Sequence, residues 1–147
     1  GGGGVIGGQL VDLESENKKV DPETLDYIHS HKTGALLRVS CTLGALLAGA
    51  GRESLEALAA YGENIGLAFQ IVDDLLDVEG DMAELGKTVG SDQARGKATF
   101  PSVYGSEKSR RLASQAVEQA KAAVKSAGID RDGKLAGLAD FILSRRN

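Results

Sequence analysis

Apolar residues recur at helical spacing through the middle of the chain. Between positions 55 and 76 they follow alternating three- and four-residue steps, which place them on one face of an α-helix. This face consists of Leu55, Leu58, Gly62, Ile65, Phe69, Val72 and Leu76. Further apolar residues, among them Leu67 and Ile71, lie on the nearly opposite side. The pattern predicts a long, mostly buried helix with Ser54 as its N-cap and its end at Gly80.

One sector of this predicted helix is polar. Its members follow steps of four, three and four, with a further aspartate at the margin: Gly66, Gln70, Asp73 and Asp77, and beside them Asp74. Three carboxylates this close repel one another, and each is costly to desolvate unless a cation compensates for its charge. Mg²⁺ is a natural candidate, because it binds through one or two carboxylates together with the phosphates of a substrate. The alternative is the solvated acidic edge of a surface helix.

Helical patterns cover most of the remaining chain. Asp21-Pro22-Glu23 predicts a helix start, with Asp21 as N-cap and Pro22 in the first turn. Residues 35–47, 106–127 and 134–144 predict further helices, whereas the glycine-rich stretch 81–105 predicts loops and short turns. Because no period-two strand pattern occurs, we expect an all-α architecture over residues 1–147.

Composition limits the possible partners. Aromatic residues make up 4% of the 147 residues and the formal charge is −4, which argues against a nucleic-acid partner. The sequence shows neither a signal peptide nor an apolar run long enough for a membrane span, and the single Cys41 fits a reducing compartment, so we expect a cytoplasmic protein. We interpret His29 and His31 as helix-surface or capping residues, since no third histidine accompanies them.

Candidate phosphate-binding residues lie on both sides of the predicted acidic helix. Lys32 and Thr33 stand between two apolar segments, where an ammonium and a hydroxyl group could grip a phosphate oxygen. The alternative is that this pair is incidental. Lys87 and Lys97 each follow a glycine in the loop after the acidic helix, and could reach back over it.

Five separated motifs are spread along essentially the whole chain. They are Gly8-Gln9-x-x-Asp12-Leu13, His31-Lys32-Thr33-Gly34, Phe69-Gln70-x-x-Asp73-Asp74-x-x-Asp77, Leu85-Gly86-Lys87 and Gly96-Lys97-x-Thr99-Phe100-Pro101. In order and approximate spacing they resemble the motifs of one family, the trans-type polyprenyl synthases, which include farnesyl and geranylgeranyl diphosphate synthases. Each is weak alone, but the set is specific. The resemblance implies an all-α fold that is the C-terminal half of an isoprenoid-synthase-type helical bundle.

The resemblance also implies a reaction and a metal. Members of the family condense isopentenyl diphosphate with an allylic diphosphate of the geranyl or farnesyl type: the allylic diphosphate ionises, the isopentenyl double bond attacks, and a proton is lost. Asp73, Asp74 and Asp77 resemble the second aspartate-rich motif, which binds Mg²⁺ bridging to the allylic diphosphate. Asp73 is accordingly implied to be catalytic, since metal ions stabilise diphosphate as a leaving group.

Roles for the other polar residues follow from the same resemblance. Lys32 and Lys97 are similar to the lysines that contact the allylic diphosphate, with Lys87 supporting it from the loop. Thr33 and Gln70 resemble residues that line the path of the developing carbocation, where neutral dipoles stabilise the cation without trapping it. Lys32, Thr33 and Gln70 are therefore implied to be catalytic as well as substrate-binding.

Part of the family's pattern is absent from the chain. The first aspartate-rich motif and the arginine pair after it do not occur, so we interpret the chain as a C-terminal half whose N-terminal half is missing. Arg145-Arg146 resembles the basic tail that closes some family sites.

This interpretation carries expectations about assembly and activity. The resemblance implies a homodimer for the complete protein, and the isolated half is expected to be inactive. The long helix is expected to have more apolar surface than the remaining helices can cover, so that the isolated half self-associates. The alternatives are a non-catalytic helical subunit or scaffold that keeps part of the metal site, and a terpene cyclase.

Overall fold

The computed structural model describes residues 2–18, 20–83 and 98–145, and within these ranges the regular structure is helical. The predicted all-α fold class is confirmed. The elements are α1 (Val5–Ser15), α2 (Pro22–His29), the π-helical turn η1 (Ser30–Gly34), α3 (Ala35–Leu47), α4 (Arg52–Ala83), α6 (Phe100–Tyr104), α7 (Ser106–Ser126) and α8 (Lys134–Ser144).

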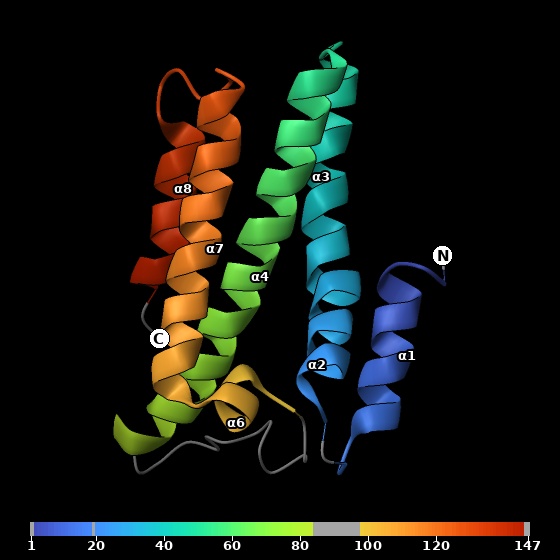
Figure 1. Ribbon diagram of the computed structural model, residues 1–147, viewed down its shortest axis with the longest axis vertical. Coiled ribbons are helices and arrows are strands. Elements are labelled where there is room, and N and C mark those ends of the chain that lie inside the picture. The colour runs from blue at the N-terminus through green and yellow to red at the C-terminus, as the bar shows by residue number, and fades with distance from the viewer. Residues whose placement is uncertain (1, 19, 84–97, 146–147) are drawn as a thin grey trace.

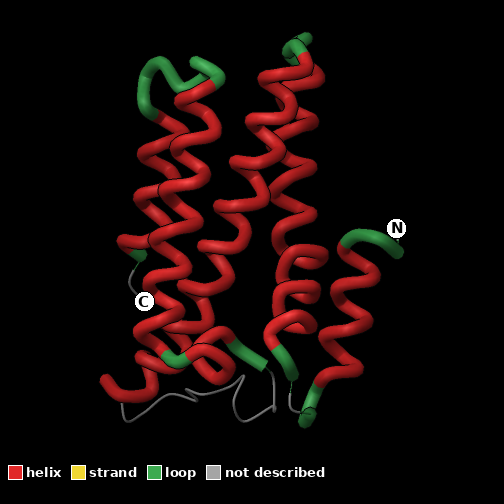
Figure 2. The backbone as a smooth tube through the Cα atoms, viewed as in Figure 1, coloured by secondary structure: helices red, strands yellow, loops and turns green. Residues whose placement is uncertain are grey.

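The helices stand roughly side by side around α4, which crosses the centre of the molecule (Figure 1). Helix α4 packs against α7 on one side and against η1 and α3 on the other. Helix α8 covers α7 and α4, while α1 packs against α2 and η1 at the opposite edge. In the tube view, the loops that join α3 to α4 and α7 to α8 lie together at one end of the bundle (Figure 2). The acidic helix is therefore the central element of the fold.

Helices α2 and α3 form one continuous helical rod through η1 (Figure 2). The rod starts as predicted, because the Asp21 carboxylate accepts a hydrogen bond of 2.7 Å from the Thr24 backbone N–H and Pro22 lies in the first turn. The π-helical turn is wider than an α-helical turn, and it contains Lys32 and Thr33. Insertions of this kind often occur at functional sites.

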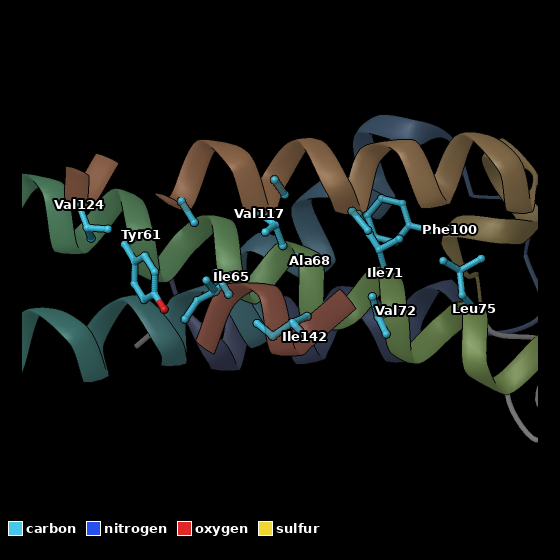
Figure 3. Close-up of a cluster of buried hydrophobic side chains, with 14 of the residues drawn as sticks. Tyr61, Ile65, Ala68, Ile71, Val72, Leu75, Phe100, Val117, Val124 and Ile142 are labelled. Carbon is cyan, nitrogen blue, oxygen red and sulfur yellow. The ribbon is translucent and has the colours of Figure 1, made fainter. Parts of the chain in front are cut away.

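The core lies mainly between α4 and α7. Figure 3 shows side chains of the two helices meeting, with Ile142 of α8 and Phe100 of α6 closing the cluster. Small residues on α7, such as Ala116 and Ala120, are buried and let α7 approach α4 closely. Tyr61 is 1% exposed and donates a hydrogen bond of 2.7 Å to the Leu135 carbonyl oxygen, which ties α4 to the start of α8.

Two expectations about the bounds of α4 are wrong. The helix begins at Arg52, so Ser54 is an internal residue, and it continues past Gly80 to Ala83. It ends later because the chain beyond Gly80 keeps hydrogen-bonding as a helix, and a single helical glycine costs only about 1 kcal/mol. The described large apolar side chains of α4 are themselves buried or partly buried between α7 and α3, and self-association of the isolated half stays a prediction.

Exposed apolar surface lies instead on the outer helices. It belongs mainly to α1, α3 and α8, with one residue of α2, and comprises Val5, Ile6, Leu10, Leu13, Tyr27, Leu36, Val39, Leu43, Leu46, Leu47, Leu138, Phe141 and Leu143. Within the described residues, no helix combines the length and the apolar content that crossing a bilayer requires.

Helices α3 and α4 approach each other at glycines. A Cβ atom added to Gly62 would lie 2.7 Å from the Arg38 Cα atom, and one added to Gly66 would lie 2.9 Å from the Gly34 Cα atom. Both distances are shorter than any relaxed contact between carbon atoms. The glycines therefore set the distance between the acidic helix and the rod that contains Lys32 and Thr33.

Replacing Gly62 with alanine is expected to lower the free energy of unfolding by about 1–3 kcal/mol, because the added methyl group meets backbone that cannot move independently. Denaturant unfolding measures the loss. Gly44→Ala on α3 is the control, because its Cβ meets nothing within 4 Å and alanine is the better helix former. Equal stabilities of the two variants would contradict the close-packing argument.

Candidate functional site

A continuous chain of hydrogen bonds joins η1, α4 and α6. The Thr33 hydroxyl donates to Gln70 Oε1 at 3.1 Å, and Gln70 Nε2 donates to Asp74 Oδ1 at 2.9 Å. The second oxygen of Asp74 accepts a hydrogen bond of 2.9 Å from the Phe100 backbone N–H, in the first turn of α6. Two predicted site residues that are 37 positions apart in sequence, Thr33 and Gln70, are thus in direct contact.

Asp74 is buried, although the helical pattern places it at the margin of the polar sector. Its exposed fraction is 3%, and both carboxylate oxygens accept hydrogen bonds. Asp74 therefore orients the Gln70 side chain and anchors α6 to α4, which is a structural role in addition to the predicted metal binding. No sequence pattern indicates this role, because the Phe100 donor is a backbone group 26 positions away.

Asp73 and Asp77 lie one helical turn apart on α4 and are partly exposed. Asp73 Oδ1 accepts a hydrogen bond of 2.8 Å from Arg145 Nη1, and the Arg145 guanidinium carbon lies 4.3 Å from the centre of the Phe69 ring. The sequence placed Arg145 in a basic tail but did not indicate its partner.

Lys32 lies on η1 and forms an ion pair with Asp12 of α1. Its ammonium nitrogen is 2.8 Å from Asp12 Oδ2, and the Asp12 side chain is only 16% exposed. Helix α1 can come this close because a Cβ on Gly8 would lie 2.7 Å from the Lys32 backbone nitrogen. The motifs around Gln9 and Lys32 are therefore neighbours, and the ion pair leaves the Lys32 side chain 34% exposed.

Two of the predicted site residues, Lys87 and Lys97, lie outside the described residues. Among the residues that the structure does describe, no group of three or more His, Cys, Asp or Glu side chains is arranged to hold a metal ion by itself. The described part of the site thus consists of Lys32 and Thr33 on η1, and Gln70 with the aspartates on α4.

His29 is buried, which corrects its interpretation as a helix-surface or capping residue. It is 7% exposed, neither ring nitrogen has a hydrogen-bond partner among the described residues, and the ring stacks on Phe100 with centres 4.9 Å apart. Burial lowers the pKa of His29 from 6.5 to about 4, against the attraction of the Asp12 carboxylate. His31 is partly exposed and bonds the Tyr27 carbonyl oxygen, in agreement with expectation.

His29 should make the folded chain sensitive to acid. The unfolded chain binds a proton with the ordinary pKa of 6.5, whereas the folded chain does so only near pH 4, so stability falls as the pH drops through this window. The full loss is roughly 3 kcal/mol. His29→Phe keeps the stacked ring and removes the titration, and unfolding measured from pH 7 to pH 4 should show a flatter loss in the variant. Parallel curves for the two proteins would contradict this role.

The fold is that of the all-α isoprenyl synthases. A polyprenyl synthase from Caulobacter crescentus, complexed with calcium and isoprenyl diphosphate, matches with a TM-score of 0.84 and 28% identity, covering 97% of this chain and 56% of that one. The polyprenyl synthetase family model matches residues 3–129, and the chain belongs to this family.

Relatives in this family cover the chain almost completely. The farnesyl diphosphate synthase of Escherichia coli is 47% identical over 146 residues, which are 97% of this chain and 48% of the relative. The geranylgeranyl diphosphate synthase of Cyanophora paradoxa is 46% identical over 148 residues, 98% of this chain and 48% of the relative. The chain thus spans about half the length of these relatives.

Proposed function

We propose that this chain provides the diphosphate-binding part of a prenyltransferase that condenses isopentenyl diphosphate with an allylic diphosphate of the geranyl or farnesyl type. The observation that carries the proposal is the contact between Thr33 and Gln70, which unites the Lys-Thr motif of η1 with the aspartate-rich motif of α4. The names of the relatives support the same class of reaction, since they are farnesyl and geranylgeranyl diphosphate synthases.

The donor set on α4 fits Mg²⁺. Asp73 and Asp77 supply partly exposed carboxylates on one face of the helix, and Mg²⁺ commonly takes one or two carboxylates, with waters and substrate phosphates as its other ligands. An ion that needs only one or two carboxylates does not require a group of three or more protein ligands, and the described residues form no such group. Asp74 stays a predicted third ligand. When bound, the metal would neutralise charge on the departing diphosphate.

The chain's own residues would bind the substrate and stabilise the cation. The Lys32 ammonium group would contact the allylic diphosphate as a point charge, with Asp12 holding it in place. Thr33 and Gln70 orient each other, so their oxygen dipoles would face the developing carbocation without supplying a nucleophile. Lys87 and Lys97 stay predicted diphosphate ligands, and the isopentenyl diphosphate partner is proposed on the same grounds.

The test is a condensation assay with the complete protein, isopentenyl diphosphate, an allylic diphosphate and Mg²⁺, repeated with a chelator. We expect a longer linear prenyl diphosphate that forms only with the metal. A cyclised hydrocarbon would indicate a terpene cyclase instead. Absence of any product, with the protein folded and the metal present, would favour the non-catalytic subunit. The homodimer, the cytoplasmic location, the missing N-terminal half and the inactivity of the isolated chain stay predictions.

A further inference from the structure

Arg145 directly follows α8 but lies against α4. The backbone leaves helical geometry at this residue, with φ −57° and ψ 133°. Its guanidinium group then makes two contacts, the hydrogen bond of 2.8 Å to Asp73 Oδ1 and the cation–π contact with Phe69. Phe69 and Asp73 are one helical turn apart, so both contacts hold the guanidinium group against a single face of α4.

The Arg145–Asp73 pair is placed where another cation can reach it. The two side chains are 29% and 41% exposed, so water screens their attraction and each can exchange its partner. The pair therefore differs from the buried Asp74 network on the same helix, whose carboxylate is 3% exposed.

A divalent cation at Asp73 would meet the guanidinium group directly. Because Arg145 bonds a carboxylate oxygen at 2.8 Å, a metal ion bound to the same carboxylate would lie within a few Å of a second positive charge. The repulsion between the metal ion and the guanidinium group opposes the binding of both to the Asp73 carboxylate at the same time. The guanidinium group also already supplies the counter-charge that this carboxylate needs.

We propose that Arg145 is a counter-cation built into the metal site, which holds the Asp73 carboxylate in the absence of metal and must be displaced for a divalent cation to bind. This inference rests on the proposed function, in which Asp73 is a metal ligand. Metal binding then releases Arg145 from both Asp73 and Phe69, so the end of α8 loses its attachment to α4. The metal site and the segment after α8 are thereby coupled.

The test measures metal affinity in the complete protein without diphosphate. Mn²⁺ replaces Mg²⁺ as the probe, and free Mn²⁺ is counted by electron paramagnetic resonance. Arg145→Gln should bind Mn²⁺ roughly fivefold more tightly than wild type, because the competing charge is gone. Arg145→Lys, which keeps the charge, should stay close to wild type. As a second readout, Mn²⁺ should speed hydrogen exchange of the last amides of α8 in wild type, but not in Arg145→Gln.

Arg110→Gln is the matched control. Arg110 lines the same cleft between α4, α7 and α8 as Arg145, but pairs with Glu79, so this variant removes an equal charge without touching Asp73. Equal Mn²⁺ affinities of Arg145→Gln and Arg110→Gln would overturn the inference. Asp73→Asn separates it from the proposed function: wild-type affinity in that variant would remove Asp73 as a ligand and overturn both, whereas lost affinity there with no gain in Arg145→Gln would overturn the competition alone.

Discussion

Replacing Asp73 with alanine in the complete protein is expected to lower turnover by roughly a hundredfold or more, because the lost carboxylate would act, through the metal, on charge that develops in the transition state. Stability should change little, since Asp73 is 41% exposed and its pair with Arg145 is solvated. Steady-state kinetics with both diphosphates, together with a denaturant curve, measures the two effects.

Glu79→Ala provides the comparison for Asp73→Ala. Glu79 is also a carboxylate of α4 with an exposed fraction of 41%, and it also pairs with an arginine, Arg110. It lies outside the aspartate-rich motif, so turnover should remain near wild type. If the two variants lose activity equally, Asp73 has no special role and the acidic sector is a solvated helix edge.

The second prediction concerns Asp74, whose replacement, unlike that of Asp73, should strongly lower stability. Asp74→Ala removes the acceptor of two donors, the partly buried Gln70 Nε2 and the buried Phe100 backbone N–H. Each unsatisfied group costs about 1–3 kcal/mol, so the free energy of unfolding should fall by roughly 2–6 kcal/mol. Denaturant unfolding of the variant, alongside Asp73→Ala, measures the difference.

Asp74→Asn sharpens this test. An asparagine amide has one oxygen and one NH₂ group, so it can accept from one of the two donors while its own NH₂ group faces the other. The asparagine variant should therefore lose a large part of what alanine loses, even though its volume is unchanged. An asparagine variant as stable as wild type would show that the hydrogen bonds to Gln70 and to the Phe100 backbone N–H contribute little to stability.

The sequence predicted the helices well because their signals are local. Asp21 and Pro22 set the start of α2, and Gly49 and Gly128 follow the ends of α3 and α7. The end of α4 was misplaced, because a lone glycine is a weak stop signal that continued helical hydrogen bonding overrides.

The candidate site was predicted as a set of residues but not as a set of contacts. The motif resemblance named Lys32, Thr33, Gln70 and the aspartates, and the structure joins Thr33 to Gln70. Periodicity could not show that Asp74 bonds a backbone N–H of α6 or that Arg145 reaches Asp73, because both partners are distant in sequence. It also could not show that His29 is buried, since that depends on Phe100 packing over the helix.

The hydrogen bond between Tyr61 and the Leu135 carbonyl oxygen gives the protein a spectroscopic reporter. The chain has no tryptophan and three tyrosines, so its near-ultraviolet signal comes mainly from tyrosine. Burial raises the pKa of Tyr61 to about 12, so the Tyr61 phenol should ionise later in an alkaline titration than an exposed one. Because Tyr61 joins α4 to α8, the absorbance of this delayed tyrosinate would report on the docking of α8 without any added label.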